Sequence, residues 1–326
     1  MKTKILRMLR ETEQFISGQD LCEKLGVSRT AVWKVIKQLR EEGYQIEAIQ
    51  NKGYYIASSP EIFSASEISS RLSVDSFIQK IHEYPEIDST NKQAKKLAEE
   101  GAVNGTLVIA DKQYQGKGRH GRSWETQSGT SIAMSLILKP DIMPNLASML
   151  TLVMGMSILE VCQKVLSVKV EIKWPNDVII DGKKVCGILT EMSAEADYVN
   201  YLIIGVGINV NGTTFIDDLE DRAISLKMAT GEQISRSELT VEILETFQKN
   251  YKLFLENKNV RFLMKQYNAN LAGINNKVRV FNQQEEYIGT SLGINESGEL
   301  LVENAAGKCQ KVYSGEVSVR GIYGYV

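Results

Sequence analysis

"VIIDGKKVCGILTEM", residues 178–192, is the stretch that decides the fold. Two apolar runs flank Asp181 and Gly182, and an Asp-Gly pair between such runs favours a two-residue hairpin turn. An antiparallel hairpin among segments of helical pattern predicts a mixed sheet and argues against a doubly wound parallel one. The hairpin therefore indicates an α+β domain.

Further strand patterns on both sides of this hairpin extend the predicted sheet. They are "KIHEYPEI" (80–87), "TLVIA" (106–110), "SIAMSLIL" (131–138), "KVEIKW" (169–174) and "YLIIGVGINV" (201–210). Helical patterns occupy residues 91–100 and 236–269. The long apolar stretch 146–166 is interrupted by Glu160, Gln163 and Lys164, so we expect a buried amphipathic helix there and no membrane span.

The first 57 residues have the pattern of three helices followed by a hairpin. Ser17 and Asp20 have capping-box spacing, Gly26 is placed to end a short helix, and Ser28 is placed to begin the next. That next helix has a buried stripe with helical spacing, formed by Val32, Val35, Ile36 and Leu39. The pattern resembles a helix-turn-helix whose second helix enters the major groove, and the turn at 51–53 predicts the wing of a winged helix.

The face opposite the buried stripe is polar and basic, which favours contact with DNA. We expect the contacting residues to be Ser28, Arg29, Thr30, Trp33, Lys34, Lys37 and Lys52. Residues 1–57 hold ten Lys and Arg against seven Asp and Glu, although the whole chain has a formal net charge of -2. The alternative is a winged helix used only for protein contacts.

The length of 326 residues predicts two or three domains. We place a winged helix at 1–60, a serine-rich linker at 58–66, a mixed-sheet catalytic domain at 64–270 and a small β-barrel at 271–326, where short strands alternate with Gly and Asn turns. Ser64 and Glu67 have the spacing of a further capping box.

Composition excludes several classes of site. The four cysteines are far apart and form no C-x-x-C pair, so we expect reduced thiols and neither a disulfide framework nor a zinc site. Residues 1–16 lack an apolar core, so we expect no signal peptide and a cytoplasmic location. With only His82 and His120, a Ser/His/Asp set is not credible. The chemistry is therefore expected to come from cations arranged around anions.

The loop "GKGRHGRSW" (116–124) alternates glycines with Lys117, Arg119 and Arg122, too much charge and backbone freedom for an ordinary strand or helix. It lies between two predicted strands and lacks the G-K-[ST] ending, which excludes both a P-loop and a Rossmann turn. Guanidinium groups bind carboxylate or phosphate in bidentate fashion, and Trp124 could cover a flat ring. A solvated basic turn is the alternative.

Three other motifs carry polar groups at special positions. In "KWPND" (173–177), Lys173 ends an apolar strand, and a charge in that position suggests that an anion or a partner meets it. Asp177 could either bind magnesium beside phosphates or form a turn or cap a helix. The hydroxyls of "DSTN" (88–91) suit a helix cap or a polar ligand. The glycines of "GVGINVN" (205–211) permit either close approach of a ligand or strand packing.

Together with "GKKVCGIL" (182–189), these motifs in this order resemble the bifunctional biotin protein ligase and biotin-operon repressor family over essentially the whole chain. The resemblance implies a winged helix, a class II synthetase-like ligase domain and an SH3-like barrel. It also implies that the protein activates biotin with ATP and Mg²⁺ as biotinyl-5'-adenylate and transfers biotin to one lysine of a carboxyl carrier protein.

The resemblance assigns roles to individual residues. Those implied for biotin are Ser89, Thr90, Asn91, Gln113, Gly116, Lys117, Gly118, Arg119, Lys184, Gly187, Gly205 and Gly207. Those implied for ATP or the adenylate are Trp124, Asn176, Asn209 and Arg320. The catalytic group would be Arg119, Lys184, Lys173 and Asp177, with Asp177 also supporting Mg²⁺.

Lys117 departs from the family loop, which commonly has arginine at that position. Lysine keeps the positive charge but lacks the planar guanidinium, which can donate two parallel hydrogen bonds. We therefore expect Arg119 to contribute more than Lys117 to binding of the adenylate. The loop as a whole is expected to close over biotin and the adenylate linkage.

The resemblance also implies partners: a biotin carboxyl carrier protein of acetyl-CoA carboxylase or pyruvate carboxylase, a second copy of the chain when the adenylate is bound, and the operator DNA of biotin genes. Two alternatives are a biotin-sensing repressor with weak or no ligase activity and a related lipoate or octanoate enzyme. The repressor would not need Lys184, Asp177 or Trp124, all of which are present.

Overall fold

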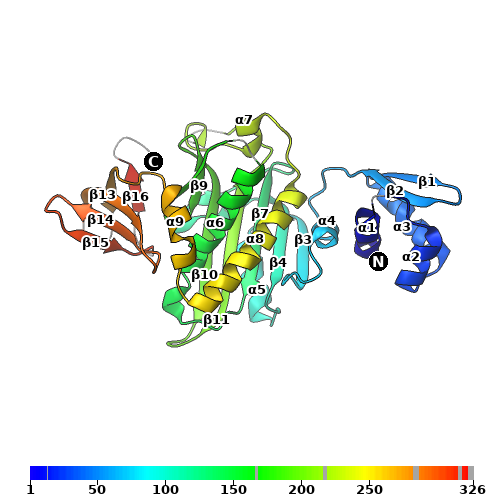
Figure 1. The fold of residues 1–326 in the computed structure, drawn as a ribbon, viewed down its shortest axis with the longest axis horizontal. Coiled ribbons are helices and arrows are strands. Elements are labelled where there is room, and N and C mark those ends of the chain that lie inside the picture. Colours follow the sequence, from blue (N-terminus) through cyan, green and yellow to red (C-terminus); the bar gives the residue numbers. More distant parts are fainter. Residues whose placement is uncertain (13, 166–167, 216–218, 282–285, 315–317, 322–326) are drawn as a thin grey trace. The chain divides into compact units, whose positions relative to one another are not determined.

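The computed structural model describes residues 1–326 apart from 13, 166–167, 216–218, 282–285, 315–317 and 322–326 (Figure 1). The chain divides into two compact units. The first comprises residues 1–75 and 235–241, and the second comprises residues 76–234 and 242–326.

The first unit contains the predicted three helices and hairpin. Its elements are α1 (Lys2–Arg10), α2 (Gly18–Leu25), α3 (Arg29–Glu41), β1 (Gln45–Ile49), β2 (Gly53–Ser58) and α4 (Ala65–Arg71). The predicted caps are confirmed, since Ser17 Oγ accepts from the Asp20 N–H at 3.0 Å and Ser28 Oγ from the Ala31 N–H at 3.3 Å. Gly26 ends α2 with φ +65°, a conformation that glycine adopts without a steric penalty.

The core of the first unit forms where α1, α2 and α3 bury their apolar stripes against the hairpin. The four apolar residues predicted for α3 are all buried: Val32, Val35, Ile36 and Leu39. They pack with Ile5, Leu6 and Leu9 of α1. Each such side chain contributes about 1.5–3 kcal/mol when fully buried. This packing fixes α3 with its polar face outward.

The buried carboxylate of Glu67 links α4 to the rest of the first unit by hydrogen bonds and ion pairs. It accepts from Arg10 Nη2 at 2.6 Å, from Arg71 Nε at 3.3 Å and from the Tyr44 hydroxyl. Burial, and then the bond to Glu67, raise the pKa of Tyr44. One of the two bonds of the capping box predicted at Ser64 and Glu67 is confirmed, because Ser64 Oγ accepts from the Glu67 N–H. The Glu67 carboxylate instead bonds the side chains of Arg10, Arg71 and Tyr44.

The second unit is built on a seven-stranded sheet of order β3-β4-β7-β11-β10-β9-β8. The strands are β3 (Lys80–Ile87), β4 (Thr106–Gln113), β7 (Ser131–Leu138), β8 (Val170–Lys173), β9 (Asp177–Ile180), β10 (Lys183–Ala194) and β11 (Val199–Asn209). β3 and β4 are parallel and the other neighbours are antiparallel. The predicted mixed sheet is confirmed, and Asp181 and Gly182 form the β9–β10 turn with φ +49° and +73°.

Helices cover both faces of this sheet. The helices described after β3 are α5 (Thr90–Glu99), α6 (Met149–Val165), α7 (Leu226–Thr230), α8 (Arg236–Asn257) and α9 (Arg261–Ala269). α5 packs on β4, β7 and β11, where Ala94 and Ala98 meet Val108, Ile137 and Ile203. α6 packs on β8, β9 and β10, and Figure 1 shows α6 and α8 crossing in front of the sheet.

By length and composition, the helical segment 144–165 is the one candidate membrane span found within the described residues. It is a buried helix, as predicted, but the prediction of an amphipathic one is wrong for its first three turns. Every residue from Met149 to Leu159 is buried. The reason is that the sheet covers one side and α8 the other, where Asn250 Nδ2 donates to Ser157 Oγ at 3.0 Å.

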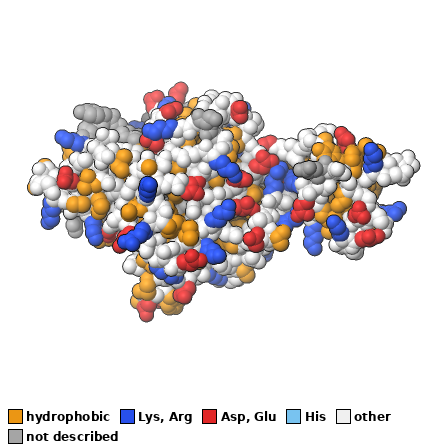
Figure 2. Space-filling model, viewed as in Figure 1, with side chains coloured by type: hydrophobic (Ala, Val, Ile, Leu, Met, Phe, Trp, Pro, Cys, Tyr) orange, Lys and Arg blue, Asp and Glu red, His pale blue; other side chains and the backbone are white. Residues whose placement is uncertain are grey.

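The carboxy-terminal part of the second unit is a five-stranded antiparallel sheet of order β15-β14-β13-β12-β16. The strands are β12 (Lys277–Phe281), β13 (Glu286–Ile294), β14 (Leu300–Asn304), β15 (Cys309–Val312) and β16 (Ser318–Gly321). On the face that Figure 2 shows, acidic and basic side chains are interspersed over the second unit, without a large area of one sign.

Candidate functional site

The floor of the candidate site is a block of small residues at matching positions on three neighbouring strands. Gly207 of β11 lies opposite Ala133 of β7 and Gly187 of β10, and Gly205 lies opposite Ser135 of β7. Directly opposed residues in antiparallel strands point to the same face of a sheet. With so little side chain on these positions, a pocket is left between the sheet and the start of α5.

Two cavities adjoin above this floor. The larger has a volume of about 1360 Å³ and the smaller of about 50 Å³. The smaller has room for a few water molecules and not for a bicyclic ligand. The residues that line both cavities are Gln113, Gly118, Arg119, Trp124, Asn176 and Lys184. The boundary between the cavities therefore carries two cations and an indole.

A chain of polar contacts fixes the charged groups at this boundary. Lys184 Nζ lies 2.8 Å from Asp177 Oδ1, and Asn176 Nδ2 donates to the same oxygen at 3.1 Å. Arg119 Nη1 donates to Asn176 Oδ1 at 3.0 Å and Nη2 to the Ser314 carbonyl at 2.8 Å. Burial lowers the pKa of Arg119 from its ordinary value. Asn176 thus links the Arg119 guanidinium to the Lys184–Asp177 ion pair.

The indole of Trp124 lies over Gly207 and lines both cavities. A Cβ on Gly207 would come within 2.5 Å of Trp124 Nε1, and Lys184 Nζ lies 5.1 Å from the ring centroid. Among the described residues, Trp124 Nε1 is buried without a hydrogen-bond partner. A buried donor without a partner carries a desolvation cost of about 1–3 kcal/mol. The indole is therefore held there by packing and by the cation.

The loop that carries Trp124 is more regular than predicted. Two short strands, β5 (Gly116–Lys117) and β6 (Ser123–Trp124), pair around the 3-10 turn η1 (Arg119–Gly121). The stretch was predicted to be no ordinary strand or helix, and it consists of two strands of two residues each around this turn. The pairing is possible because a Cβ on Gly116 would lie 2.0 Å from the Trp124 carbonyl oxygen, so glycine lets the two backbones approach.

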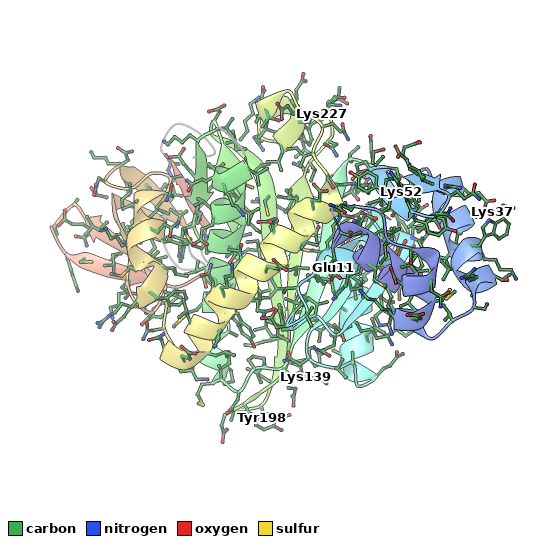
Figure 3. All side chains as sticks on the ribbon, turned by 45° about the vertical axis from the view of Figure 1, so that its right-hand side comes forward. Glu11, Lys37, Lys52, Lys139, Tyr198 and Lys227 are labelled. Carbon is green, nitrogen blue, oxygen red and sulfur yellow. The ribbon has the colours of Figure 1, made fainter. Side chains whose placement is uncertain are left out.

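The polar face of α3 forms a second candidate site, in the first unit. The residues predicted to contact DNA, Ser28, Arg29, Thr30, Trp33, Lys34, Lys37 and Lys52, are all exposed. Trp33 is 54% exposed, and Lys37 Nζ lies 5.7 Å from its ring centroid. In Figure 3, Lys37 and Lys52 both project outward from this unit. The arrangement presents an aromatic ring and several cations on one helix and its neighbouring hairpin.

Comparisons with known proteins agree with both sites. Residues 2–55 match the HTH domain family, residues 84–209 the Biotin/lipoate A/B protein ligase family, and residues 273–320 the Biotin protein ligase C terminal domain. The bifunctional ligase/repressor BirA of Bacillus spizizenii is 42% identical over 94% of this chain and 94% of its own. BirA of Escherichia coli is 29% identical over 97% of this chain and 96% of its own.

The chain belongs to the bifunctional biotin protein ligase and repressor family. A solved relative, the biotin protein ligase from Aquifex aeolicus in complex with biotin and ATP, is 31% identical with a TM-score of 0.67. It matches over 74% of this chain and 99% of its own.

In this biotin protein ligase the fold brings together most residues of the predicted ligand set. The smaller cavity is lined by Ser89, Thr90, Asn91, Gln113, Lys117, Gly118, Arg119, Lys184, Gly187, Gly205 and Gly207. Gly116 lies beside it, since a Cβ there would come within 2.8 Å of Gln113 Nε2. Ser89 also caps α5, so the helix-cap role of that residue is confirmed.

The larger cavity of the ligase is lined by Lys173, Asn176, Asp177 and Asn209 of the predicted set. Asn209 Nδ2 donates to the carbonyls of Ile224 at 3.3 Å and Lys184 at 3.5 Å, so it also steadies the backbone of Lys184. The backbone of Arg320 lies on β16 opposite Arg279, and its side chain is outside the described part of the chain.

Sequence reasoning missed several ligase residues that line or support the site. Ala133 and Ser135 of the floor were not singled out, although the alternation of small and large residues in "SIAMSLIL" could have revealed them. Glu191 accepts from Asn91 Nδ2 at 2.7 Å, but the two residues are 100 positions apart, so no local sequence pattern indicates this contact.

Proposed function

We propose that this chain joins biotin to ATP as biotinyl-5'-adenylate, transfers the biotin to a lysine of a biotin carboxyl carrier protein, and represses biotin genes through the winged helix. The observation that carries the proposal is the position of Lys184 between the two adjoining cavities, beside Arg119 and Asp177. One cavity takes biotin and the other ATP, so the lysine stands where the two substrates meet.

The chemistry follows from charge. In the first step a biotin carboxylate oxygen attacks the α-phosphorus of ATP, and pyrophosphate leaves. Both reactants are anions, and Lys184 and Arg119 lower their repulsion and stabilise the charge that grows at phosphorus. In the second step the amine of the carrier lysine attacks the acyl carbon of the adenylate, and AMP leaves.

Magnesium fits this site through a single carboxylate. The described residues contain no cluster of three or more His, Cys, Asp or Glu side chains that could hold a metal, but Asp177 lines the larger cavity. Mg²⁺ is commonly bound by one or two carboxylates together with substrate phosphates. Asp177 would hold the ion, which neutralises phosphate charge, while Lys173 and Asn176 contact the nucleotide from β8 and the turn that follows it.

Biotin-dependent exchange of pyrophosphate into ATP tests the ligase function. We expect exchange with biotin and none with lipoate. Exchange with lipoate alone would make the chain a lipoate enzyme, and no exchange with either acid would leave a biotin-sensing repressor.

A gel-shift assay tests the DNA-binding function, with the upstream region of biotin genes as the probe. We expect tighter binding when biotin and ATP are both present, because the adenylate favours a homodimer whose two winged helices bind a palindromic operator. The carrier proteins would be acetyl-CoA carboxylase or pyruvate carboxylase in the cytoplasm. Equal shifts with and without the two ligands would contradict the regulatory part of the proposal.

Biotin is expected to displace the Trp124 indole. Because the indole lies directly over Gly207 and lines the smaller cavity, saturating biotin without ATP should change the tryptophan emission of the protein. Trp174 lines the larger cavity and not the smaller one, and its buried Nε1 donates to the Gly298 carbonyl at 3.1 Å, so biotin without ATP should change its emission less. The measurement is a fluorescence titration, with Trp124→Phe as the control that loses the change. Unchanged emission at biotin concentrations that calorimetry shows to be saturating would contradict this.

Arg119 is expected to retain the adenylate more strongly than Lys117. Arg119 is anchored to Asn176 and Ser314 with its guanidinium at the shared boundary, whereas Lys117 is exposed. A charged hydrogen bond contributes about 1.5–3 kcal/mol, so Arg119→Ala should speed release of biotinyl-adenylate by roughly 10- to 150-fold and Lys117→Ala by less. Stopped-flow release rates decide the order, and equal rates for the two variants would refute it.

A further inference from the structure

A line of five polar side chains runs beneath the smaller cavity and joins four elements. Glu191 of β10 accepts from Asn91 Nδ2 at 2.7 Å, and Asn91 Oδ1 lies 2.6 Å from Ser135 Oγ of β7. Ser135 Oγ lies 2.8 Å from Thr90 Oγ1, which lies 3.0 Å from Gln113 Oε1 of β4, so the single hydroxyl hydrogen of Thr90 serves one of these two contacts. Except for Glu191, every member is at least nine-tenths buried.

The two ends of this line fix which way its amides point. The Thr90 N–H can only donate, and it lies 2.7 Å from Gln113, so the oxygen of that amide faces Thr90. At the other end, the Leu189 carbonyl and the Glu191 carboxylate can only accept. Asn91 must therefore turn its NH₂ toward them, at 3.3 and 2.7 Å, and its oxygen toward Ser135.

Both N–H groups of the Asn91 amide are thus engaged by the protein, and its oxygen is held by Ser135. The amide also lies against the backbone of β11, where a Cβ on Gly205 would come within 2.1 Å of Asn91 Oδ1. A side chain committed in this way supports its neighbours and has no hydrogen to offer a ligand. Thr90 and Gln113, the next members of the line, also line the cavity.

We propose that Asn91, Ser135 and Glu191 are positioning residues of the biotin pocket, which hold Thr90 and Gln113 in the orientation that binds biotin. The proposal rests on the ligase function proposed above. Sites of this kind bind well only when the contacting side chains are locked by hydrogen bonds from behind. Ser135 and Glu191 would then affect biotin affinity although neither is among the described residues that line the smaller cavity.

A pair of nearly isosteric substitutions tests the proposal in the full-length protein. Asn91→Asp replaces the NH₂ group by an oxygen that faces the Glu191 carboxylate and the Leu189 carbonyl, so donor and acceptor no longer match. We expect the Kd for biotin to rise about 10- to 100-fold, the range typical of losing a partner behind a contacting side chain. The KM for ATP at saturating biotin should not change.

The double substitution N91D/E191Q supplies a new N–H opposite the new carboxylate, and we expect it to recover most of the lost affinity for biotin. Such non-additivity is the signature of a direct contact. Glu191→Gln alone keeps an acceptor but loses the charge, so its effect should be smaller than that of N91D. Glu195→Gln, which changes an exposed carboxylate directly after β10, is the matched control.

Ser135→Ala is the second variant, in case N91D does not fold. It leaves Asn91 Oδ1 without its donor, and we again expect weaker biotin binding with an unchanged KM for ATP. The proposal is overturned if N91D and N91D/E191Q bind biotin equally weakly, or if folded S135A binds it as tightly as the unmodified protein. If the unmodified protein itself shows no biotin-dependent pyrophosphate exchange, it is the ligase function that fails.

Discussion

Lys184→Met lowers the rate of biotin-dependent pyrophosphate exchange by about 10²- to 10³-fold, equivalent to roughly 3–4 kcal/mol of transition-state stabilisation. The ammonium group stands between the two cavities, 2.8 Å from Asp177, and Gly187 leaves it space, since a Cβ there would lie 2.6 Å from Nζ. Methionine keeps the length of the side chain but removes the charge that draws two anionic substrates together.

The exchange assay is run at saturating biotin and ATP, so that a loss of kcat is separated from a loss of binding. Lys169→Met is the matched control, because Lys169 is an exposed lysine 2.9 Å from Glu171. Surface pairs of this kind contribute about 0–1 kcal/mol, and the control should keep its rate. A folded Lys184→Met protein with a rate within about threefold of the unmodified one would remove Lys184 from the reaction.

Glu67→Ala is expected to destabilise the first unit by about 3–5 kcal/mol, the usual cost of removing one partner from a buried ion pair. The carboxylate is 2% exposed, and its loss leaves Arg10, Arg71 and the Tyr44 hydroxyl around an empty position. Because α1 and α4 pack on each other and Arg10 bonds Glu67 across them, both helices should open together.

Native-state hydrogen exchange of peptides from α1 and α4 measures this effect, since it reports the free energy of local opening. Glu41→Ala is the control: Glu41 lies 3.7 Å from Lys37 with both side chains exposed, and its removal should change protection by less than 1 kcal/mol. If α4 keeps its protection in Glu67→Ala, the network does not hold α4 to the winged helix.

Features that depend on neighbours in the sequence could be predicted. Asp181 and Gly182 specify their hairpin through backbone conformations that these two residues tolerate, and the α3 stripe follows from helical spacing alone. The order of the motifs was enough to recognise the family. The predicted ligand set followed from that resemblance, and the fold gathers most of its described members around two adjoining cavities.

Features that depend on distant residues could not be predicted. Glu67 has the spacing of a helix cap, but its carboxylate bonds Arg10, 57 positions away. Asn91 appeared to be one more polar group in a ligand motif, and only the pairing of β7, β10 and β11 brings Ser135 and Glu191 to it. The position of Trp124 over Gly207 likewise depends on how the loop returns to the sheet.

The membership of residues 235–241 in the first unit has a consequence for biosynthesis. Arg236 bonds Glu61 across 175 positions, and Arg71 lies 2.9 Å from Glu238. A ribosome that has completed residue 75 must still add residues 76–234 before these contacts can form. At roughly 5–20 residues per second this takes on the order of 10–30 s. The winged helix therefore leaves the ribosome early but is completed late, as the nascent chain reaches α8.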